Sequence, residues 1–142
     1  MKSTGRSTWQ GSWKEGHGTV STGTTTLPAT SFSFSSRFEG TPGASPEELL
    51  AVAEAGCFNQ ALANNFGMIG YVAQSIDTTV EIELVISPEG HPTITTLHVT
   101  VKAQAAGITQ EQFTNCAERA RTNCTIAKLL NRQLTIDAEL LP

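Results

Sequence analysis

Residues 45–67 read SPEELLAVAEAGCFNQALANNFG, and this stretch decides the fold. Ser45 is a good helix N-cap, Pro46 suits the first helical position, and Glu48 completes a capping box three residues after the serine. These signals predict a helix from Pro46 to about Phe66. Its middle is rich in Ala and Gly, and small side chains let another element approach closely, so we expect a central, buried helix.

Three short segments before this helix are rich in Ser, Thr and Gly, yet they predict strands. Residues 7–13 and 18–22 carry side chains that favour β-structure, and residues 31–35 alternate apolar and polar side chains with period two. Two longer strands, 80–86 and 94–101, follow the helix. A break in the phase of the second strand, between its positions 94 and 97, predicts a β-bulge.

A second helical region is predicted over residues 109–130. A break near Asn123, itself a good N-cap, would place Cys124 in the first turn of a short last helix. A final strand is expected over residues 133–140. The resulting order, β-β-β-α-β-β-α-α-β, predicts a single α+β domain over residues 1–142, with antiparallel sheets around central helices.

Composition excludes several classes of protein. The net charge of −4 and the lack of a Lys/Arg run argue against a nucleic-acid partner. No stretch approaches the roughly 20 apolar residues that cross a bilayer, and no apolar segment follows the first residues as in a signal peptide. Three cysteines make a poor disulfide framework, so we expect a cytoplasmic protein with reduced thiols.

Cys57 lies in the middle of the Ala-rich helix, and Cys124 lies 67 positions later. A lone Cys on an apolar helix face usually packs as a small hydrophobic residue. The alternative is redox chemistry, which needs a thiolate and therefore a nearby cation, because burial raises the pKa of a thiol. At a helix N-terminus, the Cys124 thiolate would be favoured, and Cys124 could resolve an oxidised Cys57. Cys116 lies in a polar helical segment and is expected to be a bystander.

Arg37 is the most suggestive cation, because it ends a predicted strand and precedes the loop that leads into the Cys57 helix. A solvated arginine at a strand end is the alternative. A carboxylate could hold the guanidinium by a bidentate pair. Glu48 already has a capping role, so Glu47 is the expected partner of Arg37.

Glu47 and Cys57 are ten residues apart on one helix, which corresponds to about 15 Å of rise. An Arg37 held by Glu47 would struggle to reach Cys57 of its own chain, but it could reach Cys57 of a second chain whose helix packs antiparallel. The small side chains between residues 51 and 56 would permit that approach. We therefore expect a symmetric homodimer with sites shared across the two-fold axis.

Competing chemistries find little support in the sequence. There is no CxxC, no HExxH and no compact Cys/His cluster, so no metal site is expected. The lack of a GxSxG motif argues against a Ser-His-Asp hydrolase. His98 is expected to pack or to be solvated.

The sequence resembles the osmotically inducible protein C and organic hydroperoxide resistance family (OsmC/Ohr) over essentially its whole length. The resemblance rests on a combination of short motifs, Trp9-Gln10-Gly11, Gly18-Thr19-Val20-Ser21-Thr22, Ser36-Arg37-Phe38-Glu39-Gly40, Ser45-Pro46-Glu47-Glu48-Leu49, Ala55-Gly56-Cys57-Phe58 and Ser75-Ile76-Asp77-Thr78-Thr79. The placement of Arg37 is similar to that in the OsmC branch. One departure is Thr125, because the family often has Pro after its second cysteine, and this predicts a less rigid helix start.

The resemblance implies an intertwined homodimer of antiparallel sheets, with two peroxidase sites at the interface. It implies that Cys57 is the peroxidatic thiol, that Cys124 is the resolving thiol, and that Arg37 and Glu47 are the activating pair. We therefore expect reduction of organic hydroperoxides, and of hydrogen peroxide, through a Cys57 sulfenic acid and a Cys57–Cys124 disulfide. No bound cofactor is expected, and the implied reductant is a small dithiol or a lipoylated protein.

Apolar side chains near the thiol should accept the alkyl tail of a substrate, and we expect Phe38, Phe58, Met68 and Ile126 among them. The alternative function is a thiol-bearing stress protein that binds or senses without turnover. A peroxide consumption assay separates this alternative from a peroxidase.

Overall fold

The computed structural model describes residues 1–130 and 134–142. The chain forms two compact units, Met1–Leu49 and Leu50–Pro142. The expectation of a single domain over the whole chain stays a prediction.

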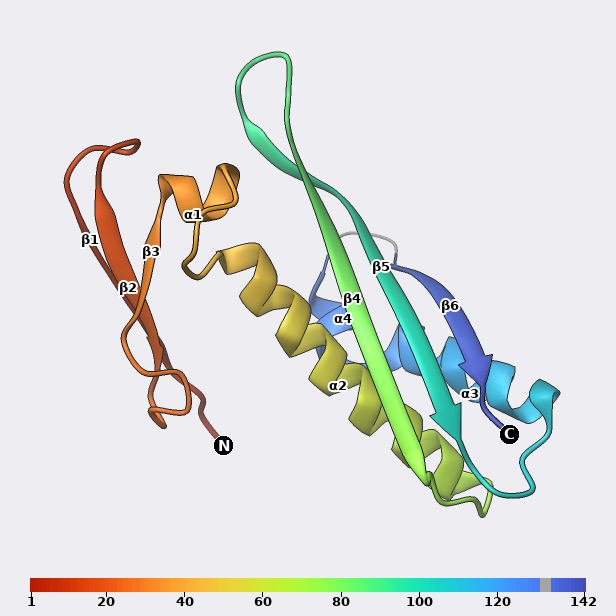
Figure 1. The fold of residues 1–142 in the computed structure, drawn as a ribbon. Helices are drawn as coiled ribbons and strands as arrows, with labels where there is room; N and C mark the ends of the chain where they lie inside the picture. The colour runs from red at the N-terminus through yellow and green to blue at the C-terminus, as the bar shows by residue number, and fades with distance from the viewer. Residues whose placement is uncertain (131–133) are drawn as a thin grey trace. The chain divides into compact units, whose positions relative to one another are not determined.

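The first unit contains a three-stranded antiparallel sheet in the order β1-β2-β3 (Figure 1). Its strands are β1 (Gly5–Gln10), β2 (His17–Thr22) and β3 (Thr30–Ser33). Gly18 of β2 lies between Trp9 and Phe32 of the neighbouring strands, whose ring centroids are 5.1 Å apart. A Cβ atom at Gly18 would collide with the Thr8 carbonyl oxygen and lie 2.9 Å from the Phe32 ring. The two rings can meet across β2 because glycine has no side chain.

A short helix, α1 (Phe34–Phe38), takes the place of the end of the strand expected over residues 31–35. The Ser33 hydroxyl accepts a hydrogen bond from the Ser36 N–H at 3.1 Å, and the Ser36 hydroxyl accepts one from the Ser33 N–H at 2.9 Å. This capping box starts a helix and overrides the alternating pattern. Arg37 therefore lies in the last turn of α1, and its expected position at a strand end is wrong.

The long helix α2 (Pro46–Met68) confirms the helix predicted at the centre of the sequence. The Ser45 hydroxyl accepts a hydrogen bond from the Glu48 N–H at 3.0 Å, as expected of an N-cap. α2 begins in the first unit and continues into the second, where three of its apolar side chains are fully buried.

The second unit is built on a long antiparallel hairpin of β4 (Ser75–Ile86) and β5 (Pro92–Gln104). A register shift between Glu83 and Leu84 leaves Thr95 without a partner in the ladder. This shift confirms the predicted bulge and bends the hairpin at that point.

The third strand of this sheet, β6 (Leu134–Leu140), pairs with β5 on the side away from β4. This pairing is parallel, and every other strand pair in the described residues is antiparallel as expected. The difference arises because helices connect β5 to β6, and such a crossover brings the chain back to the same end of the sheet. Gln133, which falls within the expected strand, lies outside the described residues.

The connecting helices are α3 (Gln110–Asn123) and α4 (Thr125–Leu129), which confirms the predicted break near Asn123. α3 begins with a capping box in which the side chains of Thr109 and Gln112 accept each other's backbone N–H groups.

α2 and α3 pack on the same face of the β4-β5-β6 sheet (Figure 1). The fully buried side chains of this core include Phe58, Leu62, Phe66, Val99, Val101, Phe113 and Ala120. Burying one such large apolar side chain contributes about 1.5–3 kcal/mol to stability. Cys116 is buried in the same core, where burial raises the pKa of its thiol, and this agrees with the expected bystander role.

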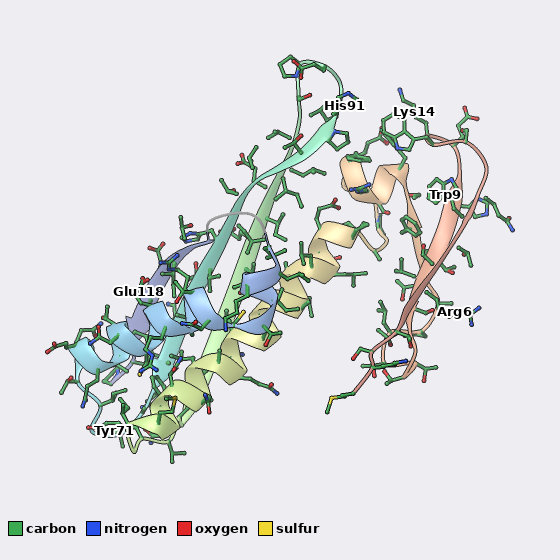
Figure 2. All side chains as sticks on the ribbon, turned by 180° about the vertical axis from the view of Figure 1, so that it is seen from behind. Arg6, Trp9, Lys14, Tyr71, His91 and Glu118 are labelled. Carbon is green, nitrogen blue, oxygen red and sulfur yellow. The ribbon has the colours of Figure 1, made fainter. Side chains whose placement is uncertain are left out.

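The outer face of the β4-β5-β6 sheet is polar. His98 lies there with Nδ1 2.5 Å from Thr135 Oγ1 and Nε2 3.1 Å from Asp137 Oδ2. Figure 2 shows His91 at the tip of the β4–β5 hairpin and Lys14 at the turn between β1 and β2. Within residues 1–130 and 134–142, none of the helices has the length and hydrophobicity needed to cross a bilayer.

Candidate active site

Two of the three free cysteines line one pocket of the second unit. Cys57 comes from α2, and Cys124 comes from the junction of α3 and α4. The pocket has a volume of about 270 Å³, and the rest of its wall includes the polar residues Gln60, Asn64, Asn123 and Thr125. The structure therefore brings together two thiols that are far apart in the sequence.

Cys57 is the more accessible of these two thiols. The adjacent Phe58 is fully buried and orients this turn of α2, so Cys57 lies at the edge of the core and is half-buried. Cys124 is only 2% exposed. The Cys57 Sγ accepts a hydrogen bond from the Ile126 N–H at the start of α4, at 3.5 Å.

Cys124 ends α3 and is itself the N-cap of α4, with an extended backbone at φ −62° and ψ 149°. Its Sγ accepts a hydrogen bond from the Ala127 N–H at 3.2 Å. The expectation that Asn123 is the N-cap, with Cys124 in the first turn, is therefore wrong by one residue. The Asn123 side chain donates instead to Thr122 Oγ1 at 3.1 Å.

A buried carboxylate, Glu54, completes the group around the thiols. It lies one helical turn before Cys57 on α2 and is 0% exposed. The Cys124 thiol donates to it, with Sγ 3.2 Å from Oε1 and 3.3 Å from Oε2. Sequence reasoning missed Glu54, although it is the lone charge in the apolar run three residues before Cys57.

The electrostatics of the pocket hold Cys124 in its protonated form. Burial, followed by hydrogen bonds with Cys57 and Glu54, raises the pKa of Cys124 to about 12. The Ala127 N–H lowers this pKa but is outweighed by burial. The expectation that a helix N-terminus would favour the Cys124 thiolate is therefore wrong. Burial also raises the pKa of Glu54, although the hydrogen bond from Cys124 lowers it.

The predicted pair of Arg37 and Glu47 is confirmed. Arg37 Nε lies 3.0 Å from Oε1 and 3.1 Å from Oε2 of Glu47, and Nη2 lies 2.5 Å from Oε1. These contacts fix the guanidinium, and the Arg37 side chain as a whole is one-third exposed. Arg37 belongs to the first unit and Cys57 to the second, so the approach of one to the other stays a prediction.

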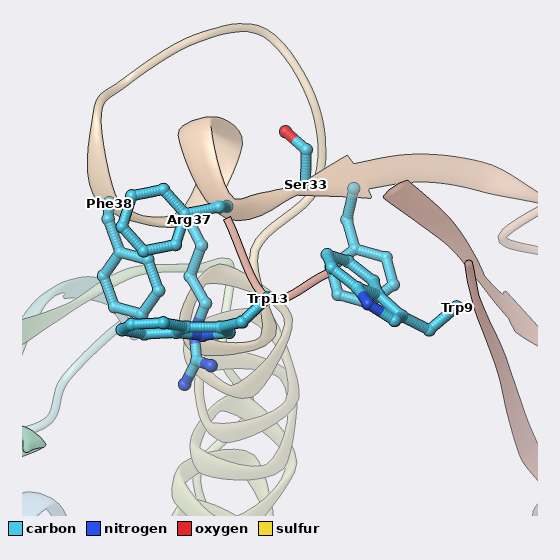
Figure 3. Close-up of a pocket in the computed structure, with 7 residues that line it drawn as sticks. Trp9, Trp13, Ser33, Arg37 and Phe38 are labelled. Carbon is cyan, nitrogen blue, oxygen red and sulfur yellow. The ribbon is translucent and has the colours of Figure 1, made fainter. Parts of the chain in front are cut away.

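Aromatic side chains of the first unit form an apolar pocket beside Arg37. Its aromatic residues are Trp9, Trp13, Phe32, Phe34 and Phe38. Figure 3 shows Arg37 and Phe38 near Trp13, with Trp9 on the other side of the pocket. The Arg37 guanidinium carbon lies 4.9 Å from the Phe38 ring centroid, which is within cation–π range.

Among the side chains expected to accept an alkyl tail, Phe38 lines this aromatic pocket. Phe58 is fully buried in the core, so its expected contact with a substrate is wrong. Met68 is 62% exposed at the end of α2. Ile126 contacts Cys57 through its backbone N–H, which donates to the Cys57 sulfur. Sequence reasoning missed the two tryptophans, whose spacing in the N-terminal hairpin was the available signal.

A family model described as OsmC-like protein matches residues 38–139, which is more than half of the chain. This chain belongs to the OsmC family. The matched range contains Glu47, Cys57 and Cys124, and it begins one residue after Arg37.

The relatives of this OsmC-family chain include the peroxiredoxin OsmC of Escherichia coli (strain K12) and that of Shigella flexneri. Each is 35% identical over 136 residues, which covers 96% of this chain and 94% of the relative. These matches place the chain in the OsmC branch of the OsmC/Ohr family, as the resemblance implied.

Solved structures of the same fold are more distant in sequence. An OsmC-like protein of unknown function from Vibrio cholerae has a TM-score of 0.74 at 15% identity, covering 97% of this chain and 99% of its own. The organic hydroperoxide resistance protein OhrB of Bacillus subtilis has a TM-score of 0.68 at 18% identity, covering 97% and 98%. These two similarities support the α+β fold of the OsmC/Ohr family.

Proposed function

We propose that this chain is a thiol peroxidase that reduces organic hydroperoxides, and hydrogen peroxide, in defence against oxidative or osmotic stress. The observation that carries the proposal is one pocket lined by two free thiols of different character. Cys57 is the accessible thiol, whereas burial holds Cys124 protonated. The names of the peroxiredoxin and hydroperoxide-resistance relatives support the same chemistry.

In the proposed reaction, the Cys57 thiolate attacks one oxygen of the peroxide and becomes a sulfenic acid as the O–O bond breaks. Arg37 stabilises the thiolate and the negative charge that develops on the leaving oxygen. Glu47 orients Arg37 through the paired contacts of its carboxylate. Cys124 then forms a disulfide with Cys57, and an external dithiol, such as a lipoylated protein, restores both thiols.

The proposed sites are shared in a homodimer, in which Arg37 of one chain serves Cys57 of the other. The spacing of Glu47 and Cys57 on one continuous helix supports this arrangement. A second support is the open surface of α2 between them. Val52 is 66% exposed, and no atom lies within 4 Å of where a Cβ on Gly56 would be. A protein that is monomeric in solution at micromolar concentration would contradict the shared site.

The apolar pocket beside Arg37 is the proposed binding site for the alkyl part of an organic hydroperoxide. Trp13 contacts Phe34 at 5.1 Å and Phe38 at 6.3 Å between ring centroids, so its loss would open one wall. We expect Trp13→Ala to raise KM for cumene hydroperoxide about 10-fold, because apolar contact with the substrate is lost. Hydrogen peroxide has no apolar part, so its kinetics serve as the control; equal losses with both substrates would contradict a tail-binding role.

Mass spectrometry after one equivalent of an alkyl hydroperoxide tests the proposed function directly. We expect the protein to lose the mass of two hydrogens and to yield a linked peptide pair that joins Cys57 to Cys124. The expectation follows from the shared pocket that both thiols line. A link to Cys116, which is buried in the core, would contradict the assignment of the resolving thiol.

Cys124→Ser is the matched variant for this experiment. The first oxidation should survive and a sulfenic acid at Cys57 should accumulate, because the thiol that closes the disulfide is gone. Reduction of the oxidised Cys57 back to the thiol by a dithiol should slow. Loss of the first oxidation in this variant would mean that the roles of the two thiols are reversed.

A further inference from the structure

The buried carboxylate of Glu54 has no role in the chemistry described so far. It is fully buried on α2 and accepts a hydrogen bond from the Cys124 thiol through both of its oxygens. A buried carboxylate costs stability unless a partner compensates it. Its contact with a redox thiol therefore suggests a function rather than a packing role.

The disulfide-closing step needs a group of this kind. A thiol is a poor nucleophile until it loses its proton. Burial, above all, raises the pKa of Cys124 to about 12, so its thiol is protonated at neutral pH. The Ala127 N–H, at 3.2 Å from Sγ, supplies a single hydrogen bond toward the thiolate. An attack by Cys124 at neutral pH therefore requires a base in contact with its sulfur.

We propose that Glu54 is this base and accepts the proton of Cys124 as Cys124 attacks the Cys57 sulfenic acid. The inference rests on the proposed function, because it concerns the second step of the same reaction. The geometry supports it, since the Sγ–Oε distances of 3.2 and 3.3 Å put the proton within direct reach of either oxygen.

Disulfide closure conserves atoms and electrons. The S–H bond of Cys124 breaks and its proton goes to a Glu54 oxygen, while the sulfur electron pair forms the S–S bond to Cys57. The S–O bond of the sulfenic acid breaks, and the leaving hydroxide takes a proton from Glu54 to become water. The Cys124 sulfur is oxidised, the Cys57 sulfur is reduced from its sulfenic state, and Glu54 ends the step as a carboxylate.

The surroundings of Glu54 suit this role. Burial raises the pKa of the carboxyl, and a carboxylate with a raised pKa is a stronger base. Within residues 1–130 and 134–142, Cys124 from the α3–α4 junction is the titratable group that contacts Glu54, and Cys57 lies one turn further along α2. A base is thus placed beside the thiol that needs one.

Glu54→Gln tests the proposal, because glutamine keeps the size and one acceptor oxygen but cannot take a proton at neutral pH. The two steps are followed by quenched-flow mass spectrometry with tert-butyl hydroperoxide, at concentrations where closure no longer depends on the peroxide. We expect disulfide closure to slow about 100-fold, the typical contribution of a general base. Formation of the Cys57 sulfenic acid should change by less than about twofold, because Glu54 acts only in the second step.

The pH profile separates a base from a structural role. In Glu54→Gln, closure should accelerate about tenfold per pH unit between pH 7 and 9, as hydroxide replaces the missing base. A loss of closure that is the same at every pH would overturn the proposal in favour of a structural role. Glu48→Gln, on the same helix, is the matched control and should close at the native rate.

Two further results distinguish this proposal from the one on which it rests. If the native protein forms no sulfenic acid at Cys57, the peroxidase function itself fails. If Glu54→Gln forms it and closes as fast as the native protein, only the role of Glu54 fails. Should Glu54→Gln not fold, the native protein still provides a test: closure must slow as pH falls through the raised pKa of Glu54. A native closure rate that stays level through that range would overturn the proposal.

Discussion

Cys57→Ser is expected to remove peroxide turnover while the protein remains folded. A serine hydroxyl does not ionise near neutral pH and forms no sulfenic acid, so we expect a loss of at least about 1,000-fold in kcat/KM. The fold should tolerate the change, because Cys57 is half-buried and its sulfur accepts one weak hydrogen bond from the Ile126 N–H. Consumption of tert-butyl hydroperoxide with a dithiol present measures the first effect, and thermal unfolding measures the second.

Cys116→Ala is the matched control for this prediction. Cys116 lies in the core and does not line the pocket that holds the other two thiols, so turnover should be retained. Some stability should be lost, because the deleted sulfur leaves a small cavity. Unchanged turnover in Cys57→Ser would remove Cys57 as the catalytic thiol, whereas a native protein that consumes no peroxide would be one that binds or senses without turnover.

Arg37→Lys is expected to lower the rate of the first oxidation about 100-fold, although the positive charge is kept. Lysine cannot reproduce the fork that Arg37 presents to both oxygens of Glu47, so the charge would no longer be held in place. The rate of Cys57 sulfenic acid formation in a single turnover measures this effect.

Arg6→Lys is the matched control. It makes the same chemical change at an exposed position on β1, away from Arg37 in the sequence. It should leave the first oxidation unchanged. Glu47→Gln should act in the same direction as Arg37→Lys, since it weakens the pair that orients the guanidinium. A native rate in Arg37→Lys would mean that another cation activates Cys57.

Local signals in the sequence predicted most elements of the fold. The start of α2 after Ser45 follows from a capping residue that acts within one helical turn. The break at Cys124 was predicted from the same kind of signal, although one residue early, at Asn123. The bulge at Thr95 follows from a change of phase within a few residues. The partner of Arg37 could also be named, because the capping role expected for the Glu48 side chain left Glu47 available.

One local signal was overlooked. The two serines at positions 33 and 36 form a capping box, and they start α1 where alternation of Phe and Ser suggested a strand. The same spacing rule that identified α2 would have found it.

Other features depend on residues that are distant in the sequence. The parallel pairing of β6 with β5 depends on the path of the crossover through α3 and α4. The contact between Glu54 and Cys124 joins positions 70 residues apart, and no local pattern indicates it. That contact, together with burial, also explains why the expected Cys124 thiolate is a protonated thiol.

Short-range patterns were thus sufficient to assign most of the helices and strands, and to predict the ion pair of Arg37 with Glu47. They could not reveal that Cys124 is protonated, or that a carboxylate accompanies it. A cap or a phase break involves neighbours along the chain. Burial and pKa depend on every group that surrounds a side chain, and here those groups come together only when α2 packs against the α3–α4 junction.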